Sequence, residues 1–192
     1  AGGALNKTGT GTLTLGGVNT YNGATNITAG TLAISAANRL PSGTAVSVAN
    51  GATFNLNGFS ETVGSIAGAG SLTLGSPGAA TTFTSGGSNA STSFTGVISG
   101  GANAAFTKAG TGTLTLSGTN TFSGNTTVSA GTLNLQNSSA LGNTAGRTTV
   151  NAGAALEFQG GIAVGAEPLF LSGSGVGTNG ALRSVSGNNS LA

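Results

Sequence analysis

A long internal repeat constrains this chain more than any other feature. The stretch KTGTGTLTLGGVNTYNGATNITAGTLAI, which begins at Lys7, returns 101 residues later as KAGTGTLTLSGTNTFSGNTTVSAGTLNL, which begins at Lys108. The offset holds without a gap as far as Leu40 and its partner Leu141. In repeat proteins each unit is stabilised mainly by its neighbours. We therefore predict one continuous repeat structure over residues 1–192, with a first unit at 5–105 and a truncated second unit at 106–192.

A shorter rhythm runs inside each unit. A glycine is followed after one residue by an apolar, polar, apolar triplet, and in the first unit these glycines are Gly11, Gly30, Gly51 and Gly70. A period of two places both apolar side chains of a triplet on one face, which is typical of a half-buried strand. In the second unit this pattern places Leu133 and Phe158 inside. Strand, glycine corner, strand and return within about 20 residues fit one coil of a parallel β-helix. The sequence predicts an all-β, single-stranded parallel β-helix (a solenoid) of about nine coils, roughly 40 to 45 Å long.

Composition excludes several classes of function. The chain has 37 Gly and only eight charged side chains among its 192 residues, far fewer than the quarter usual in soluble domains. The five basic residues are dispersed rather than clustered, so we expect no nucleic-acid partner. No apolar run approaches the length of a transmembrane helix, so we expect no membrane span in this segment.

The chemistry-bearing side chains are few. Because His and Cys are absent, His-dependent triads and thiolate nucleophiles are excluded. Three carboxylates, Glu61, Glu157 and Glu167, could supply the acid and base of a glycosidase. Glu157 lies between apolar residues of a predicted strand and should point to solvent, so we interpret all three as ordinary solvated carboxylates. We predict that the chain is not an enzyme and has no metal or other cofactor.

The two long stretches carry a family resemblance. Each is followed by a leucine, in RLPSG or ALGNT, and then by NGATFNLNG or NAGAALEFQG. Together they resemble the passenger-associated repeat of autotransporter proteins (type V secretion passengers). The resemblance implies a right-handed helix, since handedness does not follow from the spacing. It also implies an extracellular or bacterial cell-surface location, either anchored to the outer membrane through a C-terminal barrel missing here or released.

Equivalent positions in the two units give candidate surface contacts, which are Lys7 with Lys108, Asn19 with Asn120, and Tyr21, whose equivalent is Phe122. A lysine before a glycine-rich corner could meet an anionic glycan, although a solvated charge is the simpler interpretation. An aromatic ring could stack on sugar, but packing at the corner is favoured. Stacked asparagines favour ladders that hold the turns together over a binding site.

These observations predict a rigid stalk or adhesin scaffold. Its expected partners are itself, laterally or end to end, and glycans of host or neighbouring cells, held through many weak contacts. Two alternatives remain. The chain could form an extracellular filament by end-to-end stacking, because it starts just after the place where a preceding strand is expected, or it could be the stalk of an enzyme whose catalytic domain lies outside residues 1–192.

Overall fold

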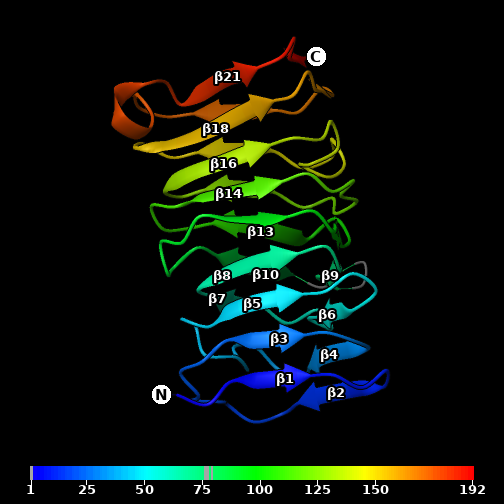
Figure 1. Cartoon of the computed structure of the whole chain (residues 1–192). Helices are drawn as coiled ribbons and strands as arrows, with labels where there is room; N and C mark the ends of the chain where they lie inside the picture. The colour runs from blue at the N-terminus through cyan, green and yellow to red at the C-terminus, as the bar shows by residue number, and fades with distance from the viewer. Residues whose placement is uncertain (1, 76–77, 79) are drawn as a thin grey trace.

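The computed structural model describes residues 2–75, 78 and 80–192 and confirms an all-β parallel solenoid (Figure 1). All strand pairings among the described residues are parallel, and these residues contain no α-helix, only a short 3-10 turn, Val176–Thr178. The longest sheet has nine strands, which corresponds to about eight turns from its first strand to its last. The coil rises from the N-terminus to the C-terminus as a right-handed helix, as the resemblance implied.

Three sheets, which we call A, B and C, form the faces of the solenoid. Sheet A contains β1 (Leu5–Lys7), β3 (Thr25–Ile27), β5 (Ala45–Val48), β8 (Ser65–Gly68), β11 (Thr92–Phe94), β14 (Thr113–Leu116), β16 (Gly131–Leu135), β18 (Ala154–Gln159) and β21 (Leu182–Ser186). Sheet B contains β2 (Thr12–Leu15), β4 (Thr31–Ile34), β6 (Thr53–Asn55), β9 (Ser71–Thr73) and β12 (Val97–Ser99). Sheet C contains β7 (Glu61–Val63), β10 (Thr81–Ser85), β13 (Ala104–Lys108), β15 (Thr126–Val128), β17 (Thr148–Val150) and β20 (Leu169–Leu171). A small fourth sheet pairs β19 (Ala163–Val164) with β22 (Ser190–Leu191).

Equivalent strands of the two sequence units occupy different faces. Strands β1 and β2 lie in sheets A and B, whereas their equivalents β13 and β14 lie in sheets C and A. The change takes place in the middle of the solenoid, where β7, β8 and β9, and then β10, β11 and β12, place a strand on all three faces. One sequence unit therefore falls one face short of a whole number of turns, and the second unit is rotated by one face relative to the first.

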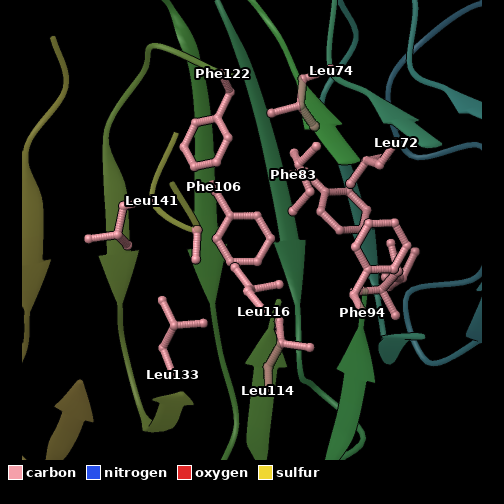
Figure 2. Close-up of a cluster of buried hydrophobic side chains, with 14 of the residues drawn as sticks. Leu72, Leu74, Phe83, Phe94, Phe106, Leu114, Leu116, Phe122, Leu133 and Leu141 are labelled. Atoms are coloured by element: carbon pink, nitrogen blue, oxygen red, sulfur yellow. The ribbon is translucent and has the colours of Figure 1, made fainter. Parts of the chain in front are cut away.

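The core is a narrow column of apolar side chains that alternate with outward residues. Leu133 and Phe158, which the pattern placed inside, are buried, as predicted. Four phenylalanines form a row, with ring centroids 6.3 Å apart for Phe54 and Phe83, 6.2 Å for Phe83 and Phe106, and 6.4 Å for Phe106 and Phe122. Figure 2 shows Phe83, Phe106 and Phe122 of this row among the surrounding leucines. Each such side chain contributes about 1.5 to 3 kcal/mol by leaving water.

Glycine is required at two equivalent Ala-Gly corners of the solenoid. Gly30 and Gly131, at equivalent positions, have φ of 64° and 63°, a left-handed conformation that side chains disfavour. A Cβ at Gly30 would also overlap the carbonyl oxygen of Gly11 in the coil before it, and one at Gly131 would overlap that of Gly110. The Ala-Gly corners thus let consecutive coils approach to the spacing of a hydrogen-bonded sheet.

Candidate functional site

The two equivalent lysines, Lys7 and Lys108, are buried at the glycine corners of the solenoid. Lys108 ends β13 and is 1% exposed, and its Nζ donates hydrogen bonds to the carbonyl oxygens of Ala109 at 2.6 Å, Gly110 at 2.8 Å and Ala130 at 3.2 Å. Burial lowers the pKa of Lys108 to about 8. At neutral pH the amine therefore remains charged, and its three protons match the three carbonyl oxygens.

Lys7 repeats this arrangement in the first unit. Its Nζ donates to the carbonyl oxygens of Gly9 and Ala29, the latter at 3.0 Å, and its side chain is buried as well. The prediction of exposed, solvated amines is wrong for both lysines. Each side chain points inward, where it links its own corner to the corner of the next coil.

Glu61 stands where sheet C begins. Its Oε2 accepts hydrogen bonds from the backbone N–H groups of Arg39 at 2.7 Å and Leu40 at 3.3 Å, and its Oε1 accepts one from Thr62 at 3.2 Å. Below β7 the chain forms a loop instead of a strand, so the carboxylate takes the place that strand carbonyls would have. Glu61 is 1% exposed, and burial raises the pKa of its carboxyl group against the opposing effect of the backbone N–H bonds.

The solvated interpretation also fails for Glu167 but not for Glu157. Glu167 is buried and accepts a hydrogen bond from Thr148 Oγ1 at 2.8 Å, and burial raises its pKa. Glu157 keeps partial exposure on the outer face of sheet A, as predicted, where it lies 2.6 Å from Arg183 and accepts from Asn134 Nδ2 at 2.9 Å. The three carboxylates sit on separate coils and do not assemble into one site.

Asn120 has a role like that of Glu61, because it forms hydrogen bonds with backbone groups at the point where sheet B ends. Its Oδ1 accepts a hydrogen bond from the backbone N–H of Ile98 in β12 at 2.8 Å, and its Nδ2 donates to the carbonyl of Ala140 at 2.6 Å. The equivalent Asn19 donates to the carbonyl of Arg39 at 2.9 Å. Both amides bridge consecutive coils through hydrogen bonds to backbone groups. Asn120 is buried, so its predicted surface contact is wrong, whereas Asn19 keeps exposed area on which a contact stays a prediction.

Tyr21 and Phe122, equivalent in sequence, differ in their surroundings. Phe122 is fully buried in the core. Tyr21 is half-buried beside a hollow of about 380 Å³, whose lining residues are Thr20, Tyr21, Asn22, Pro41, Ser42, Gly43 and Thr44. We call this the Tyr21 hollow. It lies between the corners of two consecutive coils, on the part of the solenoid where sheet C has not yet begun.

The candidate residues are thus distributed along the solenoid rather than gathered. Lys7 lies in sheet A and Lys108 in sheet C, and the equivalent TLTL strands β2 and β14 lie on different faces. Sequence reasoning missed the bridging role of Glu61, although a signal was present: Glu61 shares strand parity with the inward Val63. Within the described part of the chain, no three His, Cys, Asp or Glu side chains are placed to hold a metal ion. Nor does any helix there have the length and apolarity to cross a membrane.

Known proteins match parts of this chain. A family model described as the passenger-associated-transport-repeat matches residues 5–34 and 106–135. The chain is also 44% identical over 71 residues to the protein named adhesin BmaC autotransporter from Brucella suis biovar 1 (strain 1330). That match covers 36% of the chain and only 2% of the relative, so the chain spans a small part of the relative's length. No solved structure matches the chain significantly.

Proposed function

Because the chain is an autotransporter passenger repeat protein, we propose that it serves as a rigid, non-enzymatic scaffold within a secreted or cell-surface passenger. The observation that carries the proposal is the continuous parallel ladder of sheet A, which joins β1 to β21 through every intervening coil. A segment held by such a ladder bends little, and it keeps groups on its surface at fixed positions.

The polar side chains support this role. Buried titratable side chains often cluster at catalytic or binding sites. Here the buried Lys108, Glu61 and Glu167 are engaged by carbonyl oxygens, backbone N–H groups and a threonine hydroxyl, respectively. Their hydrogen bonds connect coils, so their placement is accounted for by the scaffold.

The rotation between units adds a consequence for display. Because the second unit is turned by one face, the equivalent corners of the two repeats look in different directions. A rod of this kind presents weak contacts around its circumference and gains strength from many simultaneous contacts rather than one deep pocket. The adhesin name of the relative is consistent with contacts to cells, and homotypic contact between rods is the second expected partner.

A bead assay tests the proposal. Fluorescent beads that carry the folded segment are applied to epithelial cells and to beads that carry the same segment, with Leu133→Asp as the matched variant whose coil is disrupted. We expect retention by the native segment and loss with Leu133→Asp. Equal retention by the disrupted variant would reject a scaffold role. Polysaccharide cleavage that disappears when all three glutamates are changed to glutamine would reject the non-enzymatic assignment.

A further inference from the structure

We propose that the Tyr21 hollow binds a neutral saccharide unit. This inference rests on the proposed function and deepens it, because it names one contact and its chemical class. The hollow has a volume of about 380 Å³, within the range of about 300 to 1,000 Å³ that small-molecule sites occupy.

The lining has the chemistry that recognises a sugar. Tyr21 supplies an aromatic ring, on which the apolar face of a pyranose can pack. Thr20 and Ser42 supply hydroxyl groups, and Asn22 supplies an amide; these side chains can both donate and accept hydrogen bonds, as sugar hydroxyls do. The site therefore matches a polyol on both its apolar and its polar sides.

The charges around the hollow do not favour an anionic ligand. No lining residue carries a charged side chain. The guanidinium of nearby Arg39 donates to the carbonyl oxygens of Ala37 at 2.9 Å and Gly16 at 3.2 Å. The Glu61 carboxylate in turn accepts from backbone N–H groups. A phosphate, sulfate or sialic acid would find no cationic side chain among the lining residues, which favours a neutral sugar.

The hollow is also preorganised. The Tyr21 hydroxyl lies 2.5 Å from Thr25 Oγ1, which lies 3.1 Å from Thr44 Oγ1, and Thr44 Oγ1 donates to the carbonyl of Gly23 at 3.0 Å. This chain of hydrogen bonds links the two corners that flank the hollow and fixes the orientation of the ring. On the other side, Glu61 holds the backbone of Arg39 and Leu40 just before Pro41. A site that is already ordered loses little entropy when a ligand binds.

The second unit provides an internal comparison. There Phe122 replaces Tyr21 and is fully buried, and Gly142 replaces Pro41 with a φ of 81°. The aromatic ring of that corner is part of the core and offers no face to a ligand. We therefore assign saccharide binding to the first corner and not to its equivalent.

The test is an amide chemical-shift titration of the whole segment with lactose, maltose and chitobiose at millimolar concentrations, and with a sulfated disaccharide as the anionic comparison. We expect at least one neutral disaccharide to shift the amides of residues 20–22 and 42–44. Tyr21→Ala should weaken binding at least about tenfold, whereas Tyr21→Phe, which keeps the ring, should bind within about threefold of the native chain. Gly43 lines the hollow and a Cβ there meets nothing within 4 Å, so we expect Gly43→Leu to be tolerated, to occupy part of the hollow and also to abolish the shifts.

Three results would overturn the proposal. They are the absence of shifts with every neutral sugar, shifts scattered over the whole solenoid, and native affinity in both Tyr21→Ala and Gly43→Leu. A folded segment that holds cells in the bead assay but responds to no sugar overturns this inference alone. A segment that binds lactose but holds neither cells nor its own copies supports the site and overturns the proposed function instead.

Discussion

The hydroxyl of Tyr21 lies 2.5 Å from Oγ1 of Thr25, and the two groups form a hydrogen bond on the inner side of a corner. In the second unit the equivalents are Phe122 and Thr126. Phe122 has no hydroxyl, and Oγ1 of the buried Thr126 finds no hydrogen-bond partner among the described residues. The threonine hydroxyl at this position thus has a hydrogen-bond partner in the first unit and none among the described residues in the second. The effect of this difference on the free energy of unfolding can be measured.

The first prediction exchanges these two rings. Phe122→Tyr supplies a partner for Thr126 Oγ1 and should raise the free energy of unfolding by about 1 kcal/mol, while Tyr21→Phe should lower it by about the same amount. Thermal and urea denaturation of the two single variants provide the measurement. A loss of stability in Phe122→Tyr would mean that the second corner has no room for a hydroxyl.

The second prediction concerns Glu61. Glu61→Ala leaves the N–H groups of Arg39, Leu40 and Thr62 without this acceptor and should cost about 2 to 3 kcal/mol. The raised pKa has a further effect, because the folded state then binds more protons than the unfolded state above the ordinary glutamate pKa of 4.5. The free energy of unfolding should therefore fall as pH rises from 4.5 through the folded-state pKa.

Glu61→Gln is the matched variant for that pH dependence, since it does not titrate. Its free energy of unfolding should vary less with pH between about 4.5 and 7 than that of the native chain. Glu167, whose pKa is also raised, contributes equally to the pH dependence of the free energy of unfolding in both proteins. Identical pH profiles for the two proteins would show that Glu61 titrates normally.

The third prediction concerns Lys108. Its folded-state pKa of about 8 is below the ordinary lysine value of 10.5, so in that interval the unfolded state binds more protons. The free energy of unfolding should rise with pH between 8 and 10.5, by up to about 3 kcal/mol in total. Lys108→Met should remove most of this rise, and a chain whose stability is flat over the interval would contradict the lowered pKa.

The fourth prediction compares two equivalent leucines. Leu114 is 2% exposed inside the solenoid, whereas Leu13, at the same position of the first unit, is 40% exposed in the first sheet B strand. Leu114→Asp buries an unpaired charge and should prevent that coil from forming, as should Leu133→Asp and Phe158→Asp. Leu13→Asp should lower the melting temperature far less, because the carboxylate keeps its water. Equal effects of Leu13→Asp and Leu114→Asp on thermal unfolding would contradict the burial of Leu114.

Much of the fold follows from the sequence because period-two triplets and glycine corners are local signals. Leu133, Phe158 and the corner glycines were placed correctly on these grounds. The burial of Lys7, Lys108 and Glu61 was missed. A charged side chain in a short strand is expected to face solvent, because the backbone groups on other coils that form hydrogen bonds with it cannot be recognised from the local sequence. The rotation between the units was missed for a related reason: equal sequence does not reveal on which face a strand lies, since that depends on the number of residues in the intervening coils.

The rotation is the central claim, because display in several directions depends on it, and engineered disulfides test it directly. The chain has no cysteine, so a double-cysteine variant can form just one intramolecular bridge. In the structure Thr115 of β14 pairs with Ser93 of β11 in sheet A, at a spacing that a disulfide can span. Ser93→Cys with Thr115→Cys should therefore oxidise quantitatively within the folded monomer, as judged by mass and by mobility on non-reducing gels. Without the rotation, β14 would follow β12 in sheet B, and Ser99→Cys with Thr115→Cys would form the bridge instead, a result that would contradict this account.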